Sequence, residues 1–253
     1  LTLSHIIRST KKRRGSIDFE LPEIKVLLDE EGAVENVELR SRGEAERIIE
    51  DFMVAANEVV AEKLFWEEIP AIYRVHEDPD RSKISALNES LVKFGYSIKN
   101  LDDLHPGKFQ VIIEKTTGLP EGYLIHKLIL RAMQRARYAN RNMGHFGLAS
   151  RYYLHFTSPI RRYSDLVVHR MLGKSLERFI KEKEKGKYSA EFEVVAAAVS
   201  KTERTADKLE EESVKIKLIE YMQDKIGETY IARLSGMNRN KIFMELENHI
   251  EVV

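Results

Sequence analysis

The spacing of apolar residues divides the chain into helices and strands. Over residues 43–65 apolar side chains recur every three or four positions, which predicts an amphipathic helix. Its apolar face comprises Ile48, Ile49, Phe52, Met53, Ala56, Val59 and Val60. The same spacing predicts further helices near the N-terminus, after Asp78 and Pro79, over residues 124–139, from Ser158 to about Lys183, and from Ala190 to about Lys225.

Strands are predicted on both sides of this helical region. Apolar-rich runs flank "DEEGA" (residues 29–33), which indicates a β-hairpin. From Gly227 the pattern changes to a period of two, which predicts a second hairpin that turns at residues 236–240 and a third short strand. The fold class is therefore expected to be α+β, helix-rich from residue 44 to 225, with a short β portion before this region and a small β-domain after it.

Two adjacent arginines stand at the predicted start of the helix after Ser158. Ser158 suits an N-cap and Pro159 suits the first turn, so Arg161 and Arg162 would lie at a helix end that already carries a partial positive charge. An arginine there costs about 0.3 to 1 kcal/mol, a cost that a bound anion would remove. Unpaired backbone N–H groups, the hydroxyls of Thr157 and Ser158, and a guanidinium would together bind a phosphate.

The same residues also allow a purely structural interpretation. One arginine would pair with Asp165, a turn away, while the other extends into solvent. His169, on the same predicted helix, is favoured as a hydrogen-bonded structural residue over a catalytic one. Both interpretations of the arginines remain open at this point.

Composition limits the kinds of partner and site. The chain of 253 residues has 41 Lys and Arg against 41 Asp and Glu, so any anion site must be a local patch. It contains no cysteine, which excludes disulfides and thiolate metal sites and is typical of an intracellular protein; a cytoplasmic location is expected. No stretch approaches the roughly 18 apolar residues of a spanning helix, so no membrane partner is expected.

The stretch from Gly144 to Arg170, "GHFGLASRYYLHFTSPIRRYSDLVVHR", resembles the signature near the end of the catalytic domain of RNase II/RNase R (RNB-domain) exoribonucleases. Four other stretches agree with that family in order and spacing: "RRGSIDF", "IIEDFMVAANEVVA", "YRVHEDPD" and "TERTADKLEEE". The strands after Gly227 resemble the start of the S1 RNA-binding domain, an OB-type β-barrel. The resemblance implies a catalytic-domain part over residues 1–225 and an incomplete S1-like part over residues 226–253.

This resemblance implies a magnesium-dependent hydrolase that threads single-stranded RNA through a channel. It would release nucleoside 5′-monophosphates processively from the 3′ end, within a monomeric parent protein. Arg161 would hold the region of the scissile phosphate, and Phe19 would stack on the last bases, an interaction worth about 1 to 3 kcal/mol per base. The remaining RNA-binding candidates are Glu50, Asp51, Tyr152, His155, Thr157, Ser158, Arg162, Glu203 and Arg204.

Without the resemblance, these candidates have ordinary structural interpretations. Phe19 would be a core residue, and the acidic groups would lie on the polar faces of their helices. The aspartates that bind metal in the family, in a D-x(5)-D-x-D-D pattern, are absent, and Asp102 and Asp103 lack that spacing. Two-metal hydrolysis needs carboxylates to hold the ions. We therefore expect a fragment that contains no metal ligands and is inactive alone.

Two competing hypotheses remain. The chain would be an RNA-binding module with a degenerate nuclease domain, or a helical interaction protein in which the two arginines only form ion pairs. Salt-sensitive binding of single-stranded RNA would exclude the second. The choice between the RNase II and RNase R branches, the biological substrates and the oligomeric state stay open.

Overall fold

The computed structural model describes residues 1–19, 23–40, 42–237, 240–248 and 250–252. Its helices are α1 (Thr2–Arg14), α2 (Glu44–Trp66), α3 (Arg81–Val92), α4 (Pro106–Thr116), α5 (Gly122–Ala132), the 3₁₀ turn η1 (Phe146–Leu148), α6 (Tyr163–Leu176) and α7 (Glu182–Gln223). Its strands are β1 (Ile24–Leu28), β2 (Val34–Leu39), β3 (Tyr73–Val75), β4 (Arg137–Ala139), β5 (Ala232–Met237), β6 (Ile242–Leu246) and β7 (Glu251–Val252).

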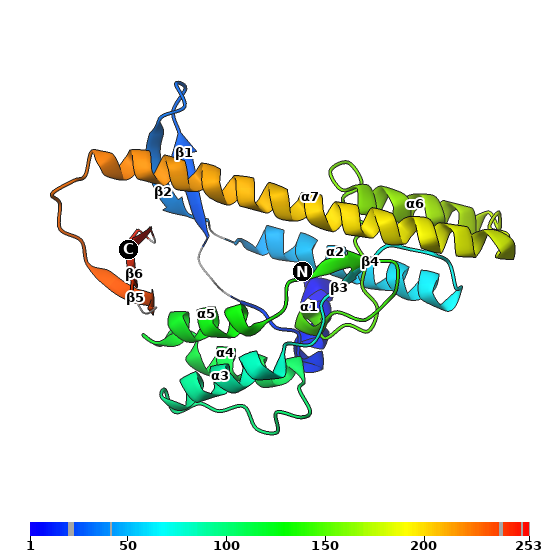
Figure 1. Cartoon of the computed structure of the whole chain (residues 1–253), viewed down its shortest axis with the longest axis horizontal. Coiled ribbons are helices and arrows are strands. Elements are labelled where there is room, and N and C mark those ends of the chain that lie inside the picture. Colours follow the sequence, from blue (N-terminus) through cyan, green and yellow to red (C-terminus); the bar gives the residue numbers. More distant parts are fainter. Residues whose placement is uncertain (20–22, 41, 238–239, 249, 253) are drawn as a thin grey trace.

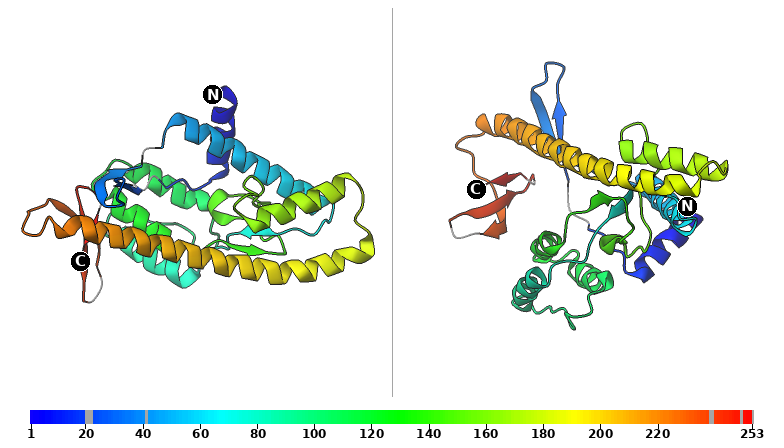
Figure 2. Two further views of the ribbon diagram at one scale, coloured as in Figure 1. Left: turned by 90° about the horizontal axis from the view of Figure 1, so that it is seen from above. Right: turned by 45° about the vertical axis from the view of Figure 1, so that its right-hand side comes forward.

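Helix α7 runs along the whole length of the molecule (Figure 1). Helix α6 lies beside its N-terminal half, and the β1–β2 hairpin lies beside its C-terminal half. Helices α3, α4 and α5 form a separate group on the other side of the molecule (Figures 1 and 2). That group has its own core, centred on the fully buried Ile84, Leu91, Phe109, Ile125 and Ile129.

The short β3–β4 ribbon connects the central elements. Tyr73 pairs with Ala139 and Val75 with Arg137 in antiparallel register, and Tyr73 also forms a bridge to Leu154. The backbone N–H of Tyr138 donates to Ser200 Oγ on α7 at 2.9 Å. The ribbon therefore joins α7 to the segment that carries the arginine motif.

Helix α2 is confirmed, but the predicted apolar face is not the one that packs inward. The buried residues of α2 are Asp51, Val54, Asn57, Ala61 and Leu64. Ile49, Phe52 and Val59 are exposed instead. Two polar side chains thus take inward positions that apolar periodicity assigned to other residues.

Several predicted helix boundaries are wrong. Helix α6 begins at Tyr163 rather than at Ser158, because the N–H groups of Arg161 and Arg162 both donate to the Ser158 carbonyl and close a turn there, at 3.3 and 3.1 Å. Helix α6 ends at Leu176 rather than near Lys183, and α7 begins at Glu182 rather than at Ala190.

The middle of the chain differs in three further places. Asp80, not Asp78 with Pro79, caps α3, since its carboxylate accepts the Ser82 N–H at 2.8 Å. Helix α5 ends at Ala132, so the part of the predicted helix beyond it forms an irregular segment and β4. Helix α4 was not predicted at all.

The predicted β portions are confirmed as strands. β1 and β2 pair antiparallel around the predicted turn, and β5, β6 and β7 form an open three-stranded antiparallel sheet. Within the described residues this sheet is not a closed barrel; residues 238–239 of the predicted turn lie outside them. The apolar side chains of Val37, Leu218, Leu246 and Ile250 pack the sheet, the hairpin and α7 together. Of the helices that the structure describes, none combines the length and apolar character needed to cross a membrane.

Candidate nucleic-acid interface

A buried carboxylate holds the turn that precedes α6. Asp165 has no exposed surface, and one of its oxygens, Oδ1, accepts hydrogen bonds from the Ser158 N–H and from Arg162 Nη2, both at 2.8 Å. The other oxygen accepts from Ser164 Oγ at 3.2 Å. Arg162 is thus directed inward, as the structural interpretation predicted. The N–H of Ser158 is occupied, so the predicted helix-end phosphate site is not present in that form.

Arg161 differs from its neighbour. It is exposed, and within the described part of the chain its guanidinium has no ion-pair partner. The flanking Thr157 is exposed and Ser158 is half-buried. The hydrogen bonds of Asp165 with Ser158 and Arg162, which we call the brace at Asp165, therefore fix the turn and leave Arg161 available to an anion.

A second arginine and a histidine lie next to this turn. Arg74, from β3, has its guanidinium carbon 4.7 Å from the centre of the Tyr138 ring. Tyr138 Oη lies 2.9 Å from His155 Nδ1 in a hydrogen bond. Burial, followed by the charges of Arg162 and Arg74 and a smaller effect of Arg161, lowers the pKa of His155 to about 2. Three arginines therefore surround one neutral histidine.

The same group includes a residue of α7. Glu203 Oε2 accepts a hydrogen bond from Arg74 Nη1 at 2.6 Å, and both side chains are largely covered. This ion pair ties α7 to β3. Arg204, the next residue along α7, is exposed. The structure thus brings Arg161, Arg162, His155 and Glu203 together, and we call Arg74, Arg161, Arg162, His155 and Glu203 the arginine cluster.

Asn57 of α2 supports this cluster and was missed by the sequence reading. Its side chain is 1% exposed. Its Oδ1 accepts the backbone N–H of Phe156 at 2.9 Å, and its Nδ2 donates to Tyr153 Oη at 3.1 Å. A buried asparagine in the middle of a helix is the signal that could have revealed it, since such a group requires partners.

Asp51 was predicted to contact RNA, but the structure gives it a different role. It is buried, and Oδ2 accepts hydrogen bonds from Ser4 Oγ and from Arg8 Nη2, both at 2.8 Å; Oδ1 lies 3.5 Å from Lys11 Nζ. These bonds and charges lower the pKa of Asp51 although burial alone would raise it. Its carboxylate fastens α1 to α2 and is not accessible to RNA.

Glu50 and Phe19 lie outside the arginine cluster. Glu50 accepts a hydrogen bond from Arg42 at 3.1 Å and lines a cavity of about 450 Å³ together with Asp18 and Gln110. Phe19 is half-buried and packs against the core of α3, α4 and α5. Part of its ring surface is therefore structural, as one interpretation predicted.

Tyr152 lies in an aromatic group at the end of α2. Its ring centre is 4.7 Å from that of Phe65 and 6.1 Å from that of Trp66. Tyr152 and Trp66 line a cavity of about 920 Å³ that also contains His76 and His145. Burial, with a smaller effect of His76, lowers the pKa of His145 to about 3.

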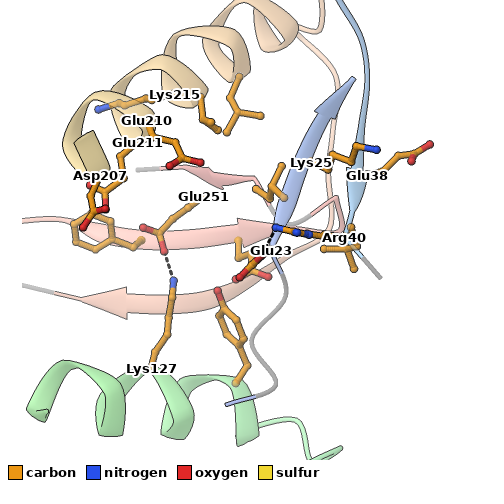
Figure 3. Close-up of a pocket in the computed structure, with 17 residues that line it drawn as sticks. Glu23, Lys25, Glu38, Arg40, Lys127, Asp207, Glu210, Glu211, Lys215 and Glu251 are labelled. Atoms are coloured by element: carbon orange, nitrogen blue, oxygen red, sulfur yellow. Dashed lines mark hydrogen bonds and ion pairs between the residues drawn. The ribbon is translucent and has the colours of Figure 1, made fainter. Parts of the chain in front are cut away.

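A larger pocket, of about 1260 Å³, lies between α5, α7, the β1–β2 hairpin and the β5–β7 sheet (Figure 3). Its acidic lining residues are Glu23, Glu38, Asp207, Glu210, Glu211, Glu245 and Glu251, and its basic ones are Lys25, Arg40, Lys127 and Lys215. Lys127 is occupied by an ion pair with Glu251 at 2.5 Å. This excess of negative charge makes the pocket a poor site for RNA phosphates.

Within the described residues, no group of three or more His, Asp or Glu side chains is arranged to hold a metal ion. These residues therefore do not fit a magnesium site, and no catalytic step through a metal follows from them.

Comparison with known proteins agrees with the motifs. Residues 1–178 match the RNB domain. The chain belongs to the RNB-domain family. It is 44% identical to Ribonuclease R from Aquifex aeolicus over 98% of its own length and 35% of that relative. It is 41% identical to Ribonuclease R from Thermotoga maritima, over 96% of the chain and 35% of that relative.

Solved structures give the same relationship. The apo form of Mycoplasma genitalium RNase R matches with a TM-score of 0.93 and 30% identity, over 99% of this chain and 40% of that one. The complex of that enzyme with ribose-methylated single-stranded RNA matches equally well, with a TM-score of 0.93. This RNB-domain chain thus spans about a third of the length of its curated relatives. The likeness confirms the predicted family and the mixed, helix-rich fold.

Proposed function

We propose that this chain forms the RNA-gripping part of a hydrolytic 3′-to-5′ exoribonuclease of the RNase R type. Its substrate is single-stranded RNA, threaded through a channel and shortened to nucleoside 5′-monophosphates. Residues 1–225 form the catalytic-domain part and residues 226–253 the beginning of an S1-like part. Family membership supports the reaction class, and the arginine cluster supports the role of this chain.

The observation that carries the proposal is the brace at Asp165. The Asp165 carboxylate forms an ion pair with Arg162 inside the protein, so Arg162 is not available to an anion. Arg161 stays exposed on a fixed turn. A guanidinium held in this way offers up to five donors in a planar fork that matches phosphate oxygens. Because the turn is already fixed, little ordering entropy is lost when a phosphate binds.

The neighbouring groups suit a phosphate for two further reasons. Arg74 adds a second positive charge, which Glu203 offsets in part. His155 stays neutral because of its lowered pKa, so it adds no charge of its own and can exchange hydrogen bonds with Tyr138 and with RNA. Phe19, Glu50 and Tyr152 lie on other elements and would line the path of the strand.

Hydrolysis requires more than the binding of a phosphate by these arginines. Arginine stabilises negative charge but does not generate a hydroxide nucleophile. The magnesium ions of the proposed parent enzyme therefore need carboxylates beyond the described residues, and the chain alone is expected to bind RNA without cutting it.

The alternative function, a non-catalytic RNA-binding module with a degenerate nuclease domain, is less favoured. The chain resembles the pseudonuclease Ssd1 of yeast with a TM-score of 0.51 over 63% of its length. Its likeness to the RNase R structures is far greater, at 0.93 over 99%. The RNase R branch is accordingly the better expectation for the parent.

The test is binding and cleavage of a 5′-labelled single-stranded RNA by the 253-residue chain with Mg²⁺, across a range of salt concentrations. Arg161→Ala should weaken binding about tenfold and reduce the salt slope by about 0.7, the value expected for one lost contact to a single strand. Arg81→Ala is the matched control, since Arg81 is an exposed arginine at the start of α3 and is not part of the arginine cluster.

Equal binding by the two variants would refute the role of Arg161. Stepwise shortening of the RNA by the unsubstituted chain would refute its predicted inactivity.

A further inference from the structure

The cavity of about 920 Å³ beside the end of α2 has aromatic walls, and we call it the Trp66 cavity. Trp66, the last residue of α2, is 68% exposed. Its ring centre lies 5.5 Å from that of Phe65 and 6.1 Å from that of Tyr152, and both contacts are edge-on. Two neighbouring rings therefore hold the indole in place, while most of its own surface stays open.

Residues 142–152 form another part of the wall, and backbone hydrogen bonds fix this segment. The N–H of His145 donates to the Ser150 carbonyl at 2.8 Å, and the N–H of Ser150 donates to the His145 carbonyl at 3.2 Å. The N–H of Phe146 donates to the His76 carbonyl at 2.8 Å. The wall is thus preformed, so little ordering entropy is lost when a ligand binds.

His145 supplies the Trp66 cavity with an uncharged hydrogen-bond donor. Its Nδ1 accepts the Leu148 N–H at 3.2 Å, and burial, with smaller effects of His76 and Arg74, lowers the pKa of His145 to about 3. The ring is therefore neutral at pH 7, and a neutral imidazole that accepts at Nδ1 carries its proton on Nε2. Among the hydrogen bonds of the described residues none uses Nε2 of His145, so this N–H is available to a ligand.

The charged residues around the Trp66 cavity do not suit a phosphate. Nη1 and Nη2 of Arg14 both donate to Glu58, and Nη2 also donates to the Leu148 carbonyl at 3.3 Å, so Arg14 is already engaged. Glu62 and Asp78 are exposed and line the same cavity, and neither forms an ion pair within the described part of the chain. Their carboxylates would repel phosphate oxygens, but they can accept hydrogen bonds from the N–H groups of a neutral ligand.

We propose that the Trp66 cavity binds one base of the RNA strand, with its phosphate outside. A base has a flat face that would stack on Trp66. Its carbonyl oxygen would accept the Nε2 proton of His145, and its ring or amino N–H groups would donate to Glu62 or Asp78. Guanine, cytosine and uracil offer both kinds of group, whereas adenine has no carbonyl. The cavity should therefore bind the first three more tightly than adenine.

This inference rests on the proposed function, because it assigns the base to the RNA strand, and it adds a contact outside the arginine cluster. Tyr152 lines the cavity and precedes His155 of the cluster by three residues. Three residues of chain span at most about 11 Å. The two sites therefore adjoin one segment, and a single strand would reach both.

The first measurement follows the indole N–H signal of Trp66, the only tryptophan of the 253-residue chain, by NMR. Guanosine, cytidine and uridine should shift this signal in a saturable way. Adenosine should bind about fivefold more weakly, the effect of one missing neutral hydrogen bond. Inorganic phosphate should leave the signal unchanged, because the cavity binds the base and not the phosphate.

The second measurement is binding of a labelled single-stranded RNA. Trp66→Ala should weaken it about tenfold, as expected for one lost stacked base, whereas Trp66→Phe should stay within about threefold because a phenyl ring also stacks. Phe179→Ala is the matched control, since Phe179 is also an exposed aromatic residue, at 69% against 68% for Trp66, and it should leave binding unchanged. Circular-dichroism melts check that Trp66→Ala keeps the fold.

Three outcomes would overturn the base site. None of the nucleosides shifts the indole signal, inorganic phosphate shifts it as strongly as guanosine does, or Trp66→Ala binds RNA as tightly as Phe179→Ala. Arg161→Ala separates this failure from failure of the proposed function. If only Arg161→Ala weakens RNA binding, the arginine grip stands without a base site; if neither variant weakens it, the proposed function fails as well.

Discussion

Replacing Asp165 by asparagine tests the brace on which the proposed grip depends. The substitution keeps the size of the side chain and one carbonyl acceptor, so the bond from the Ser158 N–H can persist. It removes the charge that opposes Arg162, whose side chain is only 18% exposed. The variant therefore leaves a largely covered guanidinium without its counter-ion.

The expected loss in the free energy of unfolding follows from the burial of the Arg162–Asp165 ion pair. Breaking a buried ion pair by removing one partner costs about 3 to 5 kcal/mol, and a hydrogen bond to a charged group contributes about 1.5 to 3 kcal/mol. Because Arg162 retains some access to water, we expect a loss of about 2 to 3 kcal/mol. For a chain of 253 residues this lowers the melting temperature by about 4 to 12 °C. Binding of single-stranded RNA should weaken as well, since Arg161 is no longer held on a fixed turn.

Circular-dichroism melts and anisotropy titrations with labelled RNA would measure both effects. Asp102→Asn is the control: Asp102 pairs with Arg81 at 3.1 Å but is 85% exposed, and such a pair contributes at most about 1 kcal/mol. If Asp165→Asn melts within 1 °C of the unsubstituted chain, or binds RNA equally well, the brace does not position Arg161.

Three further predictions concern the surroundings of the cluster. Asn57→Ala should cost about 1 to 3 kcal/mol in urea unfolding, because it leaves the partly buried N–H of Phe156 without its acceptor; a loss below 0.5 kcal/mol would contradict this. Glu203→Gln should cost about 1 to 3 kcal/mol, because it leaves the largely covered Arg74 without its counter-ion, and should tighten RNA binding about two- to fivefold, since it frees the charge of Arg74; weaker binding would contradict it. The pKa of His155 is about 2 and that of His145 about 3 in the folded chain, against 6.5 when unfolded, so stability should be complete above about pH 6.5. Below that pH the unfolded chain binds more protons, and stability should fall by up to about 1.4 kcal/mol per pH unit for each histidine; a slope between pH 7 and 5 that His155→Gln leaves unchanged would exclude this contribution.

The existence of most helices could be predicted from the sequence, but the orientation of α2 could not. A period of 3.6 residues reveals a helix whichever way it faces. Its inward face is set by partners far away in the chain: Ser4 for Asp51, 47 residues distant, and Phe156 for Asn57, 99 residues distant. Such pairs satisfy buried polar groups, and no local pattern encodes them.

The ends of several helices were predicted wrongly for a related reason. Ser158 with Pro159 has the composition of a helix start, yet Asp165 draws the Ser158 N–H into a turn and the helix begins five residues later, at Tyr163. Helix α4 was missed because its cap is unusual: His105 Nδ1 accepts the Gly107 N–H at 3.1 Å. A proline followed by glycine is more typical of a turn than of a helix start.

Part of the arginine cluster was predicted from the sequence, and its role in binding RNA stays a prediction. Two motifs led to Arg161, His155 and Glu203, which the fold brings to one place from two separate segments. Arg74 was not singled out, although it pairs with Glu203. Its partner lies 129 residues away in the chain, and the local sequence around Arg74 does not indicate it. Burial, which the sequence does not reveal, removed Asp51 from the accessible residues.

The formal net charge of zero conceals a separation of charge along α7. Glu203 belongs to the arginine cluster, whereas Asp207, Glu210 and Glu211, one to two turns further on, line the acidic pocket shared with the β5–β7 sheet. An RNA strand would be attracted to the first site and repelled from the second, over a distance of a few helical turns. If the sheet contacts RNA, as an S1-like part would, it must do so through a face other than the one that lines this pocket. If RNA binds at the arginine cluster as proposed, the acidic pocket would act as a boundary that keeps the strand on the side of the arginines.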